Sequence, residues 1–327
     1  MWLLSFVVDA FDQLQQVVYE GLVQPLMYAL GMANLLEDGF TATGWLLVGV
    51  IEIVLMLTVM RALERWRPVE PVTDRSAIRE DVLYTLIHRL GLFRLALFFT
   101  VDPLWDGVMG ELHLLGLPSF HLEQLWPGVS DIAIVSFLLY LVLFDFVDYW
   151  VHRGQHQLHW WWQLHALHHS QRQMTLWSDN RNHLLDDLLR DSAMVVVALA
   201  VGIAPGQFIA VVAFTQLLES LSHANVRMSF GWLGWLVVSP RFHRLHHSIG
   251  LGHESRGRGS IGGHNFAVLL PVWDVLFGTA NFEDRYDPTG IRDQLPEEGG
   301  RDYGRGFLAQ QWLGLRRLAR RAEPPSA

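Results

Sequence analysis

Three short histidine-rich segments are the residues in this sequence best suited to metal chemistry. HRGQH, HALHH and HRLHH together contain eight histidines, which are His152, His156, His165, His168, His169, His243, His246 and His247. Residues at i, i+3 and i+4 share one face of an α-helix, so each segment can direct two or three imidazoles to one point. Neutral imidazole is the commonest protein ligand for metals. The spacing therefore predicts a metal centre.

The number of histidines predicts two metal ions rather than one. A site such as that of zinc closes with about four ligands, and eight imidazoles exceed this number. The chain has 16 histidines in all, 13 of them between His152 and His264, and it has no cysteine. Thiolate ligands and a thiol nucleophile are therefore excluded.

Several other residues are candidates for supporting roles. His223 precedes HRLHH by 20 residues, and we expect it to be a ninth ligand. His183 could bind metal or could cap the helix that follows it, and His264 follows a glycine-rich loop that favours a structural role. Asp148 lies four residues before His152 on the same helix face. It could orient that histidine through the second ring nitrogen, or it could be an ordinary acid near a helix end.

The composition predicts an integral membrane protein. Hydrophobic residues make up 51% of the 327 residues and charged residues only 17%, with a mean hydropathy of +0.21, whereas soluble domains are about 25% charged. The net charge of −9 argues against a nucleic-acid partner. We predict an all-α fold with about four transmembrane or re-entrant helices and a cytoplasmic helical cap that holds the histidines.

Four apolar stretches approach the roughly 20 residues needed to cross a bilayer. The clearest are 44–60, in which Glu52 is the only charged residue, and 131–150. Charged residues interrupt 82–104. The stretch 193–221 is broken at 204–206 by Ala-Pro-Gly, which predicts a hairpin.

Arginine, the only basic residue type besides histidine, predicts the orientation. Arginines cluster in 61–79, none occurs between Arg94 and Arg153, and they return afterwards. By the positive-inside rule, 61–81 and everything after 151 face the cytoplasm, while 105–130 faces out. The histidines then lie on the cytoplasmic side, and a bacterial inner membrane is the expected location.

The chain divides into three predicted regions. Residues 1–130 form N-terminal membrane helices, 131–290 form the catalytic domain, and 291–327 form a polar tail. Within the tail, 307–321 has an apolar side beside four arginines. This pattern predicts either a helix on the membrane surface or a helix packed on the domain.

The order HxxxH, HxxHH and HxxHH after an apolar helix resembles the fatty acid hydroxylase/sterol desaturase superfamily. The resemblance covers about 131–290 and is carried by DYWVHRGQH, LHALHHS, SHANVR, FHRLHHS and NFAVLLPVWDVLFGT. One departure is Ala267, where relatives usually have glycine. The resemblance implies a membrane enzyme with two iron ions that uses O2 and electrons from a separate cytoplasmic donor. It would insert oxygen into a C–H bond of a membrane lipid, with the eight histidines and His223 as ligands.

Two alternatives stay open at this point. A desaturase of the same superfamily would remove two hydrogens from the lipid instead of inserting oxygen. A histidine-rich divalent-metal transporter would place its ligands near the middle of the bilayer. A zinc protease is excluded because neither HRGQH nor HALHH has the glutamate of H-E-x-x-H. Among lipids, the sequence favours an acyl or polar membrane lipid as the substrate.

Overall fold

The computed structural model describes residues 2–118, 120–251 and 263–320, and their regular structure is helical. Within these ranges there is no β-strand, and an isolated β-bridge joins Ser248 and Thr289. The predicted all-α class is therefore confirmed for the described residues.

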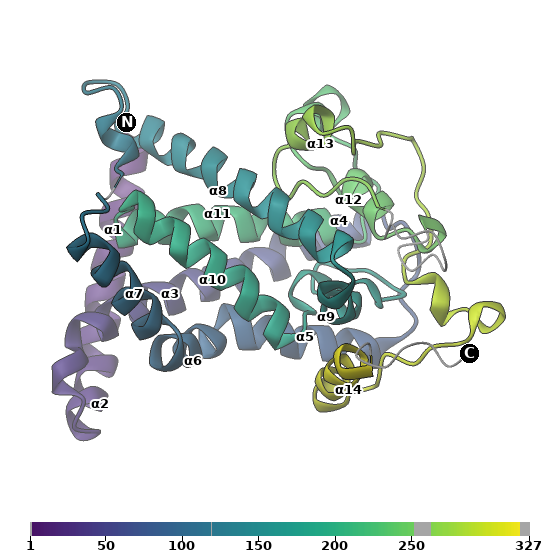
Figure 1. Ribbon diagram of the computed structural model, residues 1–327, viewed down its shortest axis with the longest axis horizontal. Coiled ribbons are helices and arrows are strands. Elements are labelled where there is room, and N and C mark those ends of the chain that lie inside the picture. Colours follow the sequence, from purple (N-terminus) through teal and green to yellow (C-terminus); the bar gives the residue numbers. More distant parts are fainter. Residues whose placement is uncertain (1, 119, 252–262, 321–327) are drawn as a thin grey trace.

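The long helices lie side by side along the long axis of the molecule (Figure 1). They are α3 (Leu36–Leu55), α5 (Arg75–Arg89), α8 (Ala133–Gln157), α10 (Leu184–Val201) and α11 (Pro205–His223). One end of this bundle carries α1 (Trp2–Val18), α2 (Gln24–Ala29), α6 (Leu92–Thr100) and α7 (Asp102–Leu114). The other end carries α4 (Arg61–Trp66), α9 (His159–His169), α12 (Pro240–His246), α13 (Val272–Leu276) and α14 (Phe307–Arg320).

Two helical segments are long and apolar enough to cross a membrane. They are Ala33–Trp66, which includes α3 and α4, and Ala133–Gln157, which is α8. The pair α5 and α6 would be a third if counted as one span, but it is bent by 49° at Leu90–Gly91. Gly91 has a φ of +76°, a conformation that favours glycine. The predicted span 82–104 is therefore a broken one.

The predicted hairpin in 193–221 is present as α10 and α11. Gly202 ends α10 in the left-handed conformation, and Pro205 begins α11, where its missing N–H is not needed. Both helices pack on α8, and α11 also packs on α3. Neither is counted among the helices apolar enough to span a membrane.

Arg89 joins the helices of the bundle through charged hydrogen bonds. Its guanidinium, 1% exposed, donates to Glu52 Oε2 at 2.8 Å and to Asp179 Oδ2 at 2.9 Å. It also donates to Gln216 Oε1 and Ser220 Oγ of α11. Breaking a buried pair leaves an uncompensated charge, so this residue holds α3, α5 and α11 together. Glu52, the charged residue within the apolar stretch 44–60, is thus paired with Arg89, which interrupts the stretch 82–104.

The C-terminal helix α14 packs on the domain with one face and is exposed on the other. It lies against α9 and α5, with Gln310 fully buried. Leu308, Trp312 and Leu315 point outward and are 80%, 61% and 41% exposed. Position 321, the last of the predicted helix, lies outside the described residues.

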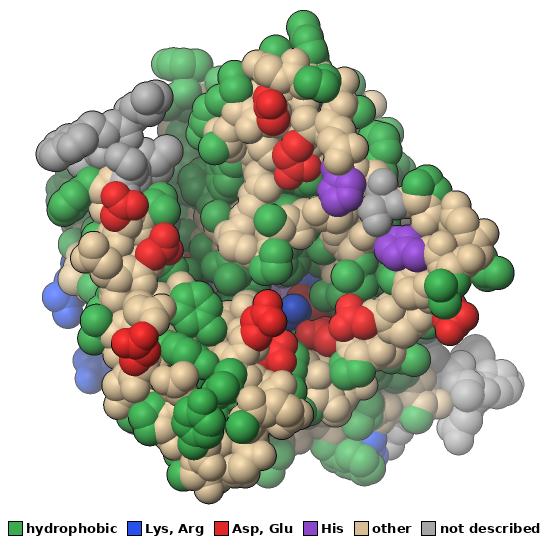
Figure 2. All heavy atoms as spheres, turned by 90° about the vertical axis from the view of Figure 1, so that its left-hand side faces the viewer, with side chains coloured by type: hydrophobic (Ala, Val, Ile, Leu, Met, Phe, Trp, Pro, Cys, Tyr) green, Lys and Arg blue, Asp and Glu red, His purple; other side chains and the backbone are tan. Residues whose placement is uncertain are grey.

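The end of the bundle formed by α1, α2 and α7 differs in charge from the histidine end. Figure 2 shows this face with hydrophobic side chains and more acidic than basic side chains among them. At the histidine end, the arginine-rich segment after the first apolar helix packs on α12, where Arg244 Nη2 lies 2.6 Å from Glu70 Oε1. The arginines and the histidines therefore share one end.

We predict that Gly49→Ala destabilises the fold. A methyl group at Gly49 would overlap the backbone carbonyl of Arg89, so α3 and α5 would have to separate. Overpacking of this kind costs about 1–3 kcal/mol. Gly110→Ala is the matched control, because Gly110 also lies inside a helix and has nothing within 4 Å of the added methyl. Thermal unfolding of the detergent-solubilised proteins should show a lower midpoint for Gly49→Ala only. Equal midpoints for the two variants would contradict the close approach.

Candidate metal centre

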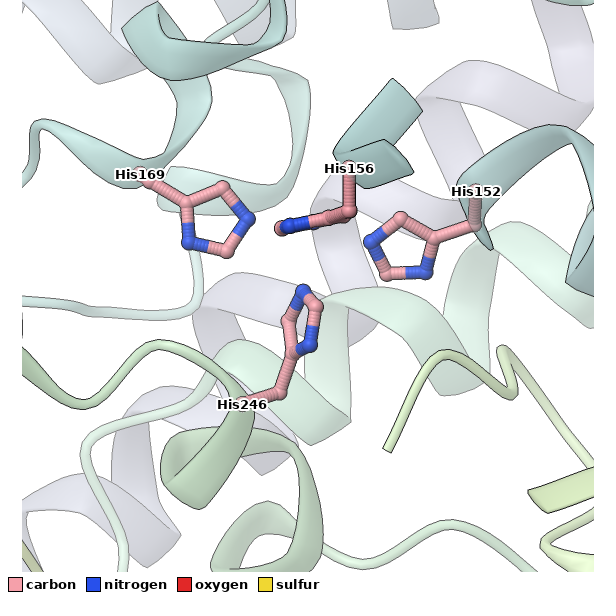
Figure 3. Close-up of side chains that lie close together, drawn as sticks. All are labelled: His152, His156, His169 and His246. Carbon is pink, nitrogen blue, oxygen red and sulfur yellow. The ribbon is translucent and has the colours of Figure 1, made fainter. Parts of the chain in front are cut away.

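Four histidines from three helices converge in what we call the first histidine group. His152 and His156 come from α8, His169 from α9 and His246 from α12. One ring nitrogen of each lies within 4.8 Å of those of the others, and Figure 3 shows the rings directed to a common centre. The i, i+4 spacing of HRGQH places both of its imidazoles in this group, as the sequence predicts.

A second histidine group contains His168, His223, His243 and His247. The Nε2 atoms of His168 and His223 lie 3.1 Å apart, those of His223 and His243 2.9 Å, and those of His243 and His247 3.1 Å. His223 comes from the end of α11, so the structure brings this predicted extra residue together with the motif histidines.

The two groups adjoin each other because α9 and α12 contribute to both. The neighbours His168 and His169 belong to different groups, and so do His243 and His246. The rings of His169 and His247 stack with centroids 4.2 Å apart. Each of the segments HALHH and HRLHH thus contributes histidines to both groups.

Most of these imidazoles are held neutral by their surroundings. Each of the eight is at most 7% exposed. Burial first, and then the neighbouring imidazoles, lowers the pKa of His168, His169, His243, His246 and His247 well below the usual value. A neutral imidazole is the form that binds metal.

Backbone carbonyls fix the orientation of three rings. The Nδ1 of His152 lies 2.7 Å from the Phe266 carbonyl oxygen, and that of His246 lies 2.7 Å from the His264 carbonyl oxygen. The Nδ1 of His223 lies 2.8 Å from the Glu219 carbonyl oxygen. Because a carbonyl only accepts, Nδ1 carries the proton in this network and Nε2 is left to bind a ligand.

Two buried aspartates shape the segment that supplies the carbonyl for His152. Asp274 accepts from the backbone N–H groups of Phe266 and Ala267 at 2.9 and 2.8 Å. Asp145 accepts from the N–H groups of Leu269 and Leu270. The NFAVLLPVWDVLFGT motif therefore acts as a support for His152. Ala267 is fully buried within it.

His165 lies beside both groups and is oriented by a carboxylate. Its Nδ1 is 2.9 Å from Asp186 Oδ2, and its Nε2 is buried without a hydrogen-bond partner among the described residues. Asp186 also accepts from Gln155 and Trp161. These two donors, from α8 and α9, hold the Asp186 side chain of α10 in place. Sequence reasoning missed Asp186, since its only signal was an acidic pair shortly after His183.

Asp148 does not have the orienting role that the sequence suggested for it. Its two oxygens accept from Arg190 Nε and Nη2 at 2.7 and 3.1 Å, and no described histidine is bonded to it. The i, i+4 spacing from His152 gives a shared helix face. However, both carboxylate oxygens of Asp148 accept hydrogen bonds from Arg190 of α10.

Two further candidates lie outside both groups. His183 begins α10, where its Nδ1 accepts from the Leu185 N–H at 3.1 Å and its Nε2 lies 2.9 Å from the Gln311 carbonyl oxygen. It therefore caps a helix, one of the two roles left open for it. His264 contacts Asn281 and supplies its carbonyl to His246.

The arrangement suits metal binding by its chemistry. Buried imidazole nitrogens gathered at one point suit a shared cation, because imidazole is a good ligand for divalent metals. Each of the two histidine groups offers four ring nitrogens within 4.8 Å of one another and could bind one metal ion.

Comparison with known proteins agrees with the motif and the geometry. The family model described as Fatty acid hydroxylase matches residues 137–279, which contain both histidine groups. Residues 137–279 of the chain form a domain of the fatty acid hydroxylase/sterol desaturase superfamily. The resemblance based on the histidine segments is thus confirmed.

Relatives within this superfamily act on different lipids. Ornithine lipid hydroxylase OlsE of Rhizobium tropici is 28% identical over 78% of this chain and 71% of its own length. Alkylglycerol monooxygenase of Homo sapiens is 31% identical over 43% of this chain and 29% of its own. Methylsterol monooxygenase 1-3 of Arabidopsis thaliana is 22% identical over 63% of this chain and 68% of its own. No solved structure matches.

The superfamily membership supports two coarse conclusions. The relatives are lipid hydroxylases and monooxygenases, so the chain falls in a family of oxidoreductases that modify lipids. Together with the apolar helices, this membership indicates a membrane protein.

We predict that Asp186→Asn weakens metal binding by about 10–100-fold, the usual effect of losing the carboxylate behind a ligating histidine. Asparagine keeps the shape but loses the charge that holds His165. Titration of the metal-free protein with Co²⁺, followed by its visible absorption, measures the affinity. Asp148→Asn is the matched control, because Asp148 bonds to Arg190 and not to a histidine. If Asp148→Asn weakened metal binding and Asp186→Asn did not, Asp148 rather than Asp186 would be the aspartate that supports the metal centre.

The metal-free protein should also lose stability as the pH falls below about 6.5. The unfolded chain takes up protons on its histidines near that pH, whereas the buried histidines with lowered pKa stay neutral. The unfolded state then binds more protons, so the free energy of unfolding decreases with falling pH. Thermal midpoints at pH 8 and pH 5.5 check the sign. A midpoint that is equal or higher at pH 5.5 would show that the native histidines are protonated.

Proposed function

We propose that this protein is a membrane-bound non-haem di-iron oxygenase that hydroxylates a C–H bond of a lipid, using O2 and electrons from a separate cytoplasmic protein. The observation that carries the proposal is the pair of adjoining four-histidine groups, both buried at one end of a bundle of apolar helices. The relatives named as hydroxylases and monooxygenases support the same reaction class.

The proposed ligands are the eight histidines of the two groups, with His165 as a ninth. Imidazole sites suit iron, zinc, copper and nickel, so the choice of iron follows from the superfamily. Two bound iron ions would supply the reduction of O2 that hydroxylation of an unactivated C–H bond requires. The chain's own contribution is to hold the rings neutral, fix their direction and exclude water.

The cytoplasmic orientation rests on the distribution of arginine. The segment 61–70 and α12 pack together at the histidine end, as the Arg244–Glu70 pair shows. The opposite end carries more acidic than basic side chains on the face shown in Figure 2. By the positive-inside rule the histidine end faces the cytoplasm, in a bacterial inner membrane, where a soluble electron donor can reach it. The domain boundaries near 130 and 290 remain predictions.

Desaturation is the nearest alternative reaction, and it needs the same ligands. Hydroxylation is favoured because the relatives from Rhizobium tropici, Homo sapiens and Arabidopsis thaliana are named as a hydroxylase or a monooxygenase. A metal transporter is disfavoured because the histidines gather where α8 ends and the short helices begin. A transport site would lie midway along the spans.

We predict that His168→Ala and His169→Ala each lower the iron content from two ions per chain to about one. These neighbours on α9 serve different histidine groups, so each variant removes a ligand from one site only. Both should abolish lipid hydroxylation. Iron is measured by mass spectrometry of the protein loaded without oxygen, and the product by a gain of one oxygen in the lipid extract.

His113→Ala serves as the control, since His113 is exposed on α7 and should leave two irons in place. Survival of hydroxylation in either α9 variant would exclude the di-iron proposal.

A further inference from the structure

Two cavities meet between the apolar helices and the histidines. The outer cavity, of about 120 Å³, lies among α3, α5, α6, α8, α10 and α11. The inner cavity, of about 30 Å³, is lined by His152, His165, His168 and His243. Asp148 and Arg190 line both cavities. A molecule that passes from the outer cavity to the histidines therefore passes this ion pair.

The outer cavity is lined by both apolar and charged side chains. The apolar side chains include Trp45, Phe93, Phe144, Met194 and Phe208. The charged side chains are Glu52, His88, Arg89, Arg94, Asp148, Arg190 and Asp191. An acyl chain alone would leave unsatisfied any charged group of this cavity that the protein does not already pair, since desolvating a charge without a partner is unfavourable.

The positive charges of this cavity are already neutralised by the protein. Arg89 pairs with Glu52 and Asp179, and Arg190 pairs with Asp148 and Glu219. Arg94 lies 3.5 Å from Asp102 and covers the ring of Trp45. His88 Nε2 lies 3.2 Å from Asp187. An anionic group would therefore meet guanidinium groups that carboxylates already occupy.

Two carboxylates of the outer cavity can accept further hydrogen bonds. Asp191 makes no hydrogen bond or ion pair with the described residues, although it faces the cavity from α10. Glu52 faces it from α3 with a side chain that is 5% exposed, and its Oε1 is buried without a hydrogen-bond partner. A buried acceptor such as Glu52 Oε1 calls for a donor, and a cationic donor forms the strongest bond with a carboxylate.

We infer that the outer cavity binds a lipid whose headgroup carries an ammonium group, with Asp191 and Glu52 as the groups that recognise it. The acyl chain lies along the aromatic side chains, and the headgroup lies among the charged side chains. This inference rests on the proposed function only for the position of the reacting C–H bond. If the histidines bind the oxidising metals, the reacting C–H bond lies in the headgroup or within a few bonds of it.

Ligand binding tests the inference without any turnover. The probes are N-myristoyl-ethylenediamine, which ends in an ammonium group, and N-myristoyl-ethanolamine, which has a hydroxyl group in its place. Both are added to the metal-free full-length protein in detergent, and affinity is measured from the change in tryptophan fluorescence. The wild-type protein should bind the ammonium probe about 10-fold more tightly, as expected for one charge-assisted hydrogen bond in a partly dry site.

Asp191→Asn, which removes the charge and keeps the shape, should reduce this preference to about 2-fold or less. Glu52→Gln provides a second test in case the first variant does not fold. Asp131→Asn is the control, because Asp131 is exposed and lines neither cavity, and it should keep the preference.

Equal affinity of the wild-type protein for the two probes would overturn the inference, and so would a preference that survives both cavity variants. Iron content is measured on the same preparations. A preference for the ammonium probe in a protein that binds no iron would uphold the headgroup site and contradict the proposed oxygenase. Two irons per chain without a preference for the ammonium probe would support the oxygenase and contradict the headgroup site.

Discussion

Eight imidazoles packed ring against ring in a dry interior are the constraint on which the rest of this structure depends. Each ring must be neutral to bind a metal ion, and its direction must be fixed. Backbone carbonyls fix three of the eight rings, and Asp186 orients His165 beside them. The loop after residue 263 and the helix α10 are therefore as necessary to the centre as the histidine segments themselves.

Helix geometry allowed the sequence to predict a histidine centre, because residues at i, i+3 and i+4 share a face. It did not show that HALHH and HRLHH divide their histidines between two groups. HxxHH places neighbouring residues of α9 in two different groups, and His223 joins the second group from the end of α11. The apolar stretches, the break before Pro205 and the helical class were likewise readable from hydropathy and proline. All of these depend on local spacing along the chain.

Contacts between distant helices could not be predicted in this way. Asp148 has the right spacing from His152, yet Arg190, 42 residues further on, takes both of its oxygens. Asp186 orients His165 from another helix, and His183 contacts Gln311 from 128 residues away. A single sequence carries no signal for such pairs. The apolar face of the C-terminal segment was visible, but its other face, which packs on α9 and α5, was not.

The charged residues of α10 connect the histidines to the interior of the helix bundle. Asp186 holds His165, Asp187 lies beside His88, Arg190 bridges Asp148 and Glu219, and Asp191 faces the outer cavity. These side chains follow one another along a single helix from the centre toward the apolar spans. The helix that orients His165 thus also lines both cavities.

The most direct test of the central claim is an anomalous difference map, recorded at the iron edge, from crystals of the iron-loaded protein. Our account predicts two separate peaks. One should lie among His152, His156, His169 and His246, and the other among His168, His223, His243 and His247. A single peak, or peaks outside these two groups, would contradict it.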